Sequence, residues 1–324
     1  MSVVVMSQKF THTDSISNIG GGGVSGDGGQ AISPEGTART SANIYSPQYL
    51  SCANSNLYIT QGSRMISKVT SRNITTVVKA PHLATNVTAS TCYLQIVNAM
   101  SILTNGTLYI TDDHIVRKIK NGVMTVVAGL NFPGNSGDGG LASDAQIYAS
   151  SMTVNPSGDI FITGNTQAGI IRKITTSTGI ITTFATGLHT FGGLMAAASN
   201  GDIFLSDSFN GQFVKITATG SVSYYTLPPH PQGYTNEPYG VGVSSTGEVY
   251  VADMRGTRVL KYTSASSYSI VVGGNGKGYS GDGGQTTSAN FYWITHISIT
   301  SKGIYVKDAN GVSGMVNIRF IGSP

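Results

Sequence analysis

The chain is organised by one recurring hydrophobic pattern. A small or polar residue precedes a triplet of the form apolar-aromatic-apolar, and the triplets recur 43 to 55 residues apart. The triplets are Leu57-Tyr58-Ile59, Leu108-Tyr109-Ile110, Ile160-Phe161-Ile162, Ile203-Phe204-Leu205, Val249-Tyr250-Val251 and Ile304-Tyr305-Val306. Alternating apolar positions and β-branched residues are typical of strands, and no window keeps apolar residues at helical spacing for three turns. The pattern therefore predicts six repeated β units.

Each unit contains four predicted strands. In the third unit they cover residues 152–154, 160–162, 171–174 and 180–183, with the triplet as the second strand and Gly158 in the hairpin before it. A glycine in a tight hairpin supplies a positive φ. A lone four-stranded sheet cannot bury both faces, so neighbouring sheets must cover it, and repeats of this length are typical of propeller blades. We therefore predict an all-β, six-bladed β-propeller of four-stranded antiparallel blades.

Two motifs carry a resemblance to a known family. A Ser-Gly-Asp-Gly-Gly loop occurs three times, at residues 25–29, 136–140 and 280–284. The segment Asp112-Asp113-His114-Ile115-Val116-Arg117-Lys118 resembles an Asn-His-x-Ile-Arg-Lys motif. Together these units resemble NHL repeats, in the variant with SGDGG loops, over nearly the whole chain. The resemblance implies the same six-bladed propeller.

The two ends of the chain are predicted to complete one blade. After the last triplet, residues 315–320 supply a third strand and the chain then stops. Residues 15–20 lead into the first SGDGG loop as residues 268–273 lead into the third, so they are expected to add the outermost strand of the last blade. This closure would remove unpaired sheet edges. The predicted domains are residues 1–14, an N-terminal arm or extra strand, and residues 15–324, a single propeller.

Composition excludes several classes of partner. Only 10% of the 324 residues are charged, compared with roughly 25% in ordinary domains. The net charge is +4 and no run of lysine or arginine occurs, so a phosphate-binding face for nucleic acid is not expected. No apolar stretch is long enough to span a membrane. The Ser/Thr-rich composition favours an extracellular or particle-surface location.

Possible covalent features are few. The two cysteines, Cys52 and Cys92, occupy adjacent units and allow one disulfide, provided that their Cα atoms lie within about 7 Å. Sequons for glycosylation occur at Asn73, Asn86 and Asn105. In a chain rich in asparagine, serine and threonine such sequons also arise by chance.

The predicted innermost strands lack the groups that catalysis needs. They contain no Asp, Glu, Lys or Arg, and the only group among them that ionises near neutral pH is His296. A lactonase-like propeller, similar to the senescence-marker or paraoxonase families, would need carboxylates in its central channel to hold calcium and act as a base. We therefore predict no catalytic residue, no metal and no cofactor. For Asp27, Asp138 and Asp282 in the SGDGG loops, backbone hydrogen bonding is favoured over calcium binding.

Histidines support an alternative function. His114 matches an ordinary repeat position and is interpreted as structural. His82, His189 and His230 precede innermost strands and could converge with His296, as the zinc ligands do in amidating lyases, which resemble NHL propellers. The alternative is therefore a metal-dependent lyase or hydrolase acting on a small molecule at the channel mouth. Stoichiometric metal in protein purified without added metal would favour it.

The favoured function is binding. Aromatic residues gather in the segments that lead into the innermost strands, and Tyr and Trp offer large contact areas at low entropic cost. Tyr45 and Tyr148 are expected to pack between blades. The candidate ligand-binding residues are Trp293, His296, Tyr239, Tyr234, His230 and His189. They predict a non-enzymatic binding or scaffold propeller, a possible surface or particle-assembly component, which presents an aromatic face to a protein or glycan. Trp293→Ala is expected to weaken that binding.

Overall fold

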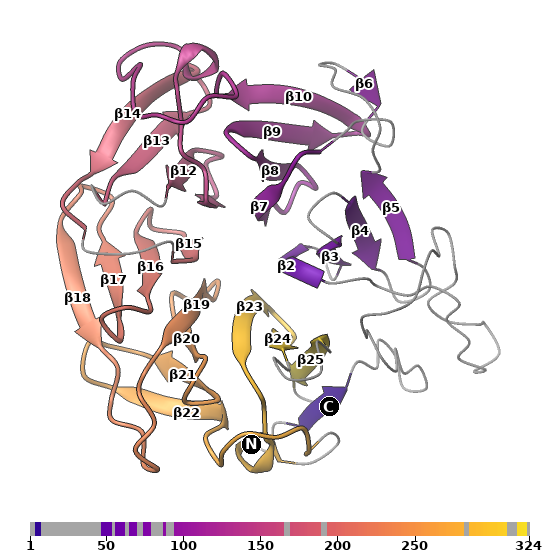
Figure 1. Ribbon diagram of the computed structural model, residues 1–324, viewed down its shortest axis with the longest axis vertical. Helices are drawn as coiled ribbons and strands as arrows, with labels where there is room; N and C mark the ends of the chain where they lie inside the picture. Colours follow the sequence, from indigo (N-terminus) through magenta and orange to yellow (C-terminus); the bar gives the residue numbers. More distant parts are fainter. Residues whose placement is uncertain are drawn as a thin grey trace.

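The computed structural model describes residues 4–7, 47–53, 56–61, 65–69, 74–78, 87–88, 94–164, 169–188, 193–281, 285–309 and 316–322. Figure 1 shows them as six β-sheets arranged around one axis. Every strand pairing within the sheets is antiparallel, and the described residues contain no α-helix. The predicted all-β, six-bladed propeller is therefore confirmed.

The blades are numbered in chain order, and the strands of each blade are given in order from the innermost to the outermost. Blade 1 consists of β2 (Pro47–Ala53), β3 (Asn56–Gln61), β4 (Met65–Val69) and β5 (Ile74–Val78). Blade 2 consists of β7 (Val97–Ile102), β8 (Leu108–Asp112), β9 (Ile115–Lys120) and β10 (Val123–Ala128), with β6 (Val87–Thr88) outside β10. Blade 3 consists of β11 (Ser151–Val154), β12 (Ile160–Thr163), β13 (Ile171–Thr175) and β14 (Ile180–Ala185).

The remaining blades follow the same order. Blade 4 consists of β15 (Met195–Ala197), β16 (Ile203–Asp207), β17 (Gln212–Ile216) and β18 (Val222–Thr226). Blade 5 consists of β19 (Pro238–Val243), β20 (Val249–Asp253), β21 (Arg258–Tyr262) and β22 (Tyr268–Gly273). Blade 6 consists of β23 (Ile294–Thr300), β24 (Gly303–Ala309), β25 (Val316–Gly322) and β1 (Val4–Ser7).

The core lies between the blades. The triplets form the second strands, and every residue of β8, β12 and β16 is buried because neighbouring sheets cover both faces. One apolar cluster joins Val116 of blade 2 to Ile160 of blade 3. Another joins Phe161 of blade 3 to Val214 of blade 4. Stability therefore depends on contacts between neighbouring repeats, as expected for a repeat architecture.

The innermost strands form a closed ring. Each of β2, β7, β11, β15, β19 and β23 contacts the next, and β2 contacts β23 (Figure 1). All six run in the same sense, so each begins on one face of the molecule, which we call the top face. The top face also carries the hairpins between second and third strands.

Ring closure by an N-terminal strand is confirmed, but with different residues. β1 lies beside β25, with Val4 opposite Gly322 and Ser7 opposite Arg319. The place predicted for residues 15–20 is therefore taken by Val4–Ser7, from the segment predicted as an arm or extra strand. Residues 15–20 lie outside the described residues. The physical reason is β propensity, because the valine-rich segment around Val4 favours a strand more than the Ser/Asn-rich one does.

The SGDGG loop at residues 136–140 confirms the structural interpretation of its aspartate. Asp138 accepts hydrogen bonds from Thr183, through the main-chain N–H (2.7 Å) and the hydroxyl, and from Arg172 (2.5 Å). Gly137 and Gly139 have φ of 91° and 83°, which favour glycine. Burial alone would raise the pKa of Asp138, but the bonds from Thr183 and Arg172 hold it below the usual range. The loop thus fixes the crossover between blades. Asp27 and Asp282 lie outside the described residues.

Candidate functional site

Buried aspartates shape the top face. In four blades such a residue is the last or second-to-last residue of the second strand, and its carboxylate accepts main-chain N–H groups of top-face loops. These aspartates are Asp112, Asp207, Asp253 and Asp308. Three of them also face an arginine of the third strand; in blade 5, for example, Arg258 Nε lies 3.0 Å from Asp253 Oδ2. Loops of otherwise irregular sequence are therefore held in fixed positions.

Two of these aspartates position the walls of a pocket between blades 4 and 5. Asp207 holds the hairpin between β16 and β17, because its carboxylate accepts hydrogen bonds from Asn210 Nδ2 (2.8 Å) and Gln212 Nε2 (2.9 Å). Asp253 accepts the N–H of Glu237 at 2.9 Å, which fixes the segment leading into β19. Asn236 Nδ2 donates to the carbonyl of Leu227 at 2.9 Å.

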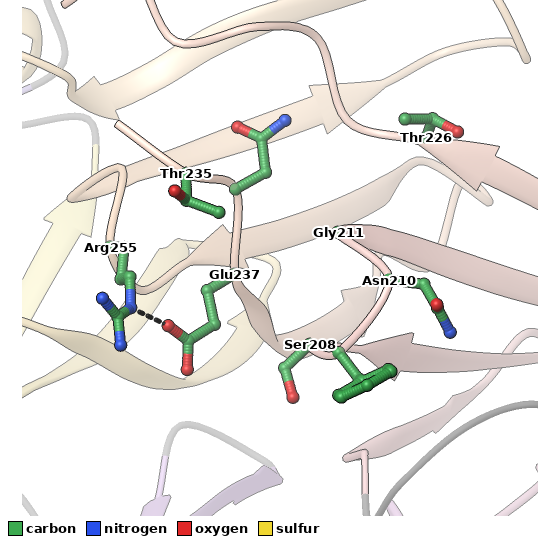
Figure 2. A pocket seen from close by; sticks show the side chains of 9 residues that line it. Ser208, Asn210, Gly211, Thr226, Thr235, Glu237 and Arg255 are labelled. Carbon is green, nitrogen blue, oxygen red and sulfur yellow. Dashed lines mark hydrogen bonds and ion pairs between the residues drawn. The ribbon is translucent and has the colours of Figure 1, made fainter. Parts of the chain in front are cut away.

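The pocket opens on the top face and has a volume of about 610 Å³. Figure 2 shows its lining, with Glu237 and Arg255 joined by an ion pair. Phe209, whose residue surface is 77% exposed, lies at the hairpin. The lining residues are Ser208, Phe209, Asn210, Gly211, Thr226, Thr235, Asn236, Glu237 and Arg255. An aromatic ring, amides, hydroxyls and one ion pair can therefore act on a single ligand. Sequence analysis named none of these residues.

His230 and Tyr234 form a pair close by. The two rings lie 4.9 Å apart, and Tyr234 is partly exposed whereas His230 is buried. His230 Nδ1 accepts the N–H of Gln232 at 3.1 Å. Burial, followed by the positive charge of Arg258, lowers the pKa of His230. His230 is therefore neutral at physiological pH and supports the loop that carries Tyr234.

Trp293 stands in the segment just before β23 and is half-buried. Its main-chain N–H points to Asp308 Oδ1 at 3.3 Å, and the Lys277 ammonium lies 5.5 Å from its ring centre. A cation over an aromatic face is a favourable contact. His189 lies outside the described residues. The six predicted residues thus do not form one described cluster, and the roles assigned to them stay predictions.

A second group of polar residues lies near the ring axis, where blades 5, 6 and 1 meet. His296 of β23 is 8% exposed, and its ring lies edge-on to Tyr49 of β2 at 5.0 Å and 6.3 Å from the ring of Tyr239 of β19. Burial, followed by the charge of Lys307, holds the pKa of His296 well below its usual range. Burial and then Tyr239 raise the pKa of Tyr49 to about 12. His296 is therefore a neutral imidazole that can donate one hydrogen bond and accept another.

Sequence analysis missed Lys307, the lysine of this group. It projects from β24 opposite His296, is 7% exposed, and its Nζ donates to the carbonyl of Gln48 in blade 1 at 3.1 Å. Burial lowers the pKa of Lys307 to about 8. The available signal was its position after the triplet, where other units carry Thr, Ser or Ala. Together, Lys307 and His296 can bind an anion or transfer a proton.

The remaining predicted features have mixed outcomes. His114 packs edge-on against Tyr148 at 6.0 Å, which agrees with structural roles for both. Cys52 lies in β2 whereas Cys92 lies outside the described residues, so their disulfide stays a prediction. Asn105 is exposed in the β7–β8 turn and accepts the N–H of Thr107 at 3.0 Å. His82, Tyr45, Asn73 and Asn86 lie outside the described residues.

The described residues offer neither a metal-binding cluster nor a membrane-spanning helix. They contain no group of three or more His, Cys, Asp or Glu side chains placed to hold a metal ion. They also contain no helix that is long and apolar enough to cross a membrane.

Solved structures of other proteins share the fold. A protein of unknown function from Bacteroides thetaiotaomicron is 15% identical, with a TM-score of 0.62 over 94% of this chain and 75% of that one. Virginiamycin B lyase from Staphylococcus aureus is 15% identical, with a TM-score of 0.51 over 84% and 83% of the two chains. A gluconolactonase from Xanthomonas campestris is 8% identical, with a TM-score of 0.57 over 85% and 86%.

These likenesses support the propeller fold, which includes enzymes, and carry no statement about activity. No model of a known protein family matches the chain, and no curated protein matches it in sequence. The resemblance to NHL repeats therefore stays a prediction.

Proposed function

We propose that this protein is a non-enzymatic binding propeller that recognises a glycan on its top face, at the boundary between blades 4 and 5. The observation that carries the proposal is the pocket of about 610 Å³ beside Phe209. Its volume lies in the range of small-ligand sites, roughly 300–1,000 Å³. The segment between β18 and β19, which lines part of the pocket, also carries His230 and Tyr234, two of the predicted ligand-binding residues.

The chemistry of the lining suits a sugar. A sugar presents hydroxyl groups, which both donate and accept hydrogen bonds, and an apolar C–H face, which packs on an aromatic ring. Phe209 offers such a ring, and Glu237 and Arg255 offer an acceptor and a planar set of donors. Because these two charges neutralise each other, the pocket favours an uncharged ligand over an ionic one. A protein partner would be expected to need a broader contact surface, roughly 800 Å² on each partner.

The test is binding to an array of neutral glycans, followed by calorimetry on the best ligand. Phe209→Ala is expected to weaken binding at least tenfold, which corresponds to about 1.4 kcal/mol, because it removes the ring on which the sugar packs. Phe132→Ala is the matched control, because Phe132 is another exposed phenylalanine (66%) that does not line the pocket. The control is expected to bind like the parent.

Two further variants define the extent of the site. Glu237→Gln keeps the shape but breaks the ion pair, and it is expected to weaken glycan binding several-fold. Trp293→Ala tests whether recognition extends to blade 6. Absence of any glycan ligand, or equal losses for Phe209→Ala and Phe132→Ala, would overturn the proposal. If a protein bound instead of a glycan and its binding required Phe209, the proposed surface would be right and the proposed ligand class wrong.

A further inference from the structure

Lys307 departs from a rule that the other blades follow. The residue after each triplet is small and sits at the same place in the second strand: Thr60, Thr111, Thr163, Ser206 and Ala252. Three of the hydroxyl groups form hydrogen bonds with main-chain groups of an innermost strand. Thr60 Oγ1 accepts the N–H of Tyr49 at 2.9 Å, and Ser206 Oγ donates to the carbonyl of Tyr239 in the next blade at 2.7 Å. Lys307 makes the same cross-blade link to Gln48. A hydroxyl would be sufficient for that link, so the ammonium needs another explanation.

Among the described residues, no negative charge pairs with the Lys307 ammonium. An ammonium has three donors, and the described residues supply one acceptor, the carbonyl of Gln48. The adjacent carboxylate, Asp308, instead accepts the N–H of Tyr292 and faces Arg319 at 3.5 Å. An uncompensated charge on a residue that is only 7% exposed is costly. A negatively charged ligand would supply both the missing charge and the missing acceptors.

His296 adds a second group without a partner. It is Lys307's cross-strand neighbour, so both side chains project from the same face of the sheet. Neither ring nitrogen of His296 has a hydrogen-bond partner among the described residues. Tyr239, at 39% exposure, places a phenol ring 6.3 Å from the imidazole. Lysine, imidazole and phenol are all able to donate hydrogen bonds, and no carboxylate among the described residues forms an ion pair with Lys307 or His296.

We propose that Lys307, His296 and Tyr239 form a binding site for a small organic carboxylate, near the ring axis where blades 5, 6 and 1 meet. The two oxygens of the carboxylate accept from the Lys307 ammonium and from the imidazole N–H, and the partly exposed Tyr239 lies on the side from which the ligand enters. This site is separate from the pocket between blades 4 and 5.

The experiment is an NMR titration of the full chain with sodium acetate, which replaces sodium chloride at constant ionic strength. The ring protons of His296, assigned with His296→Gln, report on binding. A saturable shift with one site per chain is expected. Lys307→Met keeps an unbranched side chain of similar length, removes the charge, and is expected to weaken acetate binding at least tenfold. Lys302→Met is the matched control, since Lys302 is exposed in the β23–β24 turn, and it should bind like the parent.

A further variant and a further titration test the same site. Tyr239→Phe, at a partly exposed position that should tolerate it, is expected to lower affinity a few-fold while the circular dichroism spectrum stays that of the parent. Ethylamine, a cation of similar size, is expected to cause no shift. A shift that never saturates, an equal response in Lys307→Met, or an equal response to ethylamine would overturn the site. Tighter binding of inorganic phosphate than of acetate would overturn the carboxylate class.

Discussion

At the scale of single residues, the position after each triplet shows how a small change in a repeat creates local chemistry. Ser206 and Lys307 both reach a carbonyl of the next blade, but only the lysine brings a charge into the interior. The charged form is penalised by burial, which lowers the pKa of Lys307 to about 8. Because of this penalty, we expect the stability of the protein to depend on pH.

Because the pKa of Lys307 falls from 10.5 to about 8 on folding, the unfolded chain binds more protons than the native state between these pH values. The free energy of unfolding therefore rises as pH increases through this window. Below pH 8 the native state bears the full cost of burying the charged amine. Lys307→Met removes this pH-dependent contribution. The difference in unfolding free energy between parent and variant is expected to change by about 3 kcal/mol between pH 7 and pH 10.5, in favour of the parent at high pH. Urea unfolding at several pH values measures it.

Lys302→Met is the control for this titration as well, because an exposed lysine should leave the difference independent of pH. A flat difference for Lys307→Met would show that its amine is not penalised in the native state. Comparing differences, rather than absolute stabilities, cancels the titration of the other groups, which both proteins share.

The candidate site could be predicted from the sequence only in part, and the reasons are physical. His296 was recognisable because it is the single histidine on the innermost strands. Lys307 was not, because a lysine on a second strand is normally solvated and its burial depends on blade 1 packing against blade 6. The pocket between blades 4 and 5 was not predicted, because the residues that line it are of types common in hairpins. Phe209, an apolar residue in the turn Ser208-Phe209-Asn210-Gly211, was the one visible signal.

At the scale of elements, the triplets predicted the second strands well because they are buried on both faces and must be apolar there. The predicted innermost strand at residues 152–154 is β11, which begins one residue earlier. The closing strand was misplaced because it pairs across the whole sequence, with Met6 opposite Phe320, so no local pattern decides which N-terminal segment fills the place. Two N-terminal segments were candidates for this place, and the valine-rich one around Val4, which has the higher β propensity, fills it.

Deleting residues 1–8 is expected to destabilise the protein, because it removes β1 and exposes the edge of β25. The midpoint of thermal unfolding should fall by roughly 5 °C or more, and aggregation should increase. A synthetic peptide of residues 1–10, added in excess, should restore part of the loss by binding the vacant edge. A scrambled peptide serves as the control. A truncated protein that melts like the parent would show that β1 contributes nothing to closure.

At the scale of the whole molecule, the ring is continuous in space although the chain has two ends. Blade 6 combines three strands from the C-terminal end with one from the N-terminal end, and β2 packs against β23 as neighbouring innermost strands do elsewhere. The blades meet through similar apolar clusters, such as those between blades 2 and 3 and between blades 5 and 6. The position of the break in the chain is therefore not what defines the fold.

A circular permutant tests this equivalence. Val4 lies directly opposite Gly322, so joining the ends through residues 323–324 and 1–3 makes a five-residue hairpin loop, a length that connects antiparallel strands readily. The new ends are placed between Asn121 and Gly122, in the exposed turn between β9 and β10. Blade 2 then has three strands at one end of the chain and the fourth at the other, which is the arrangement of blade 6. We expect a soluble monomer with the parent's circular dichroism spectrum and a single cooperative melt, because exposed turns tolerate new ends.

A second permutant, opened between Tyr109 and Ile110 in the buried strand β8, should fail to fold. If the first permutant is insoluble while the parent is not, the native position of the ends is required, and closure through β1 is more than the pairing of one strand.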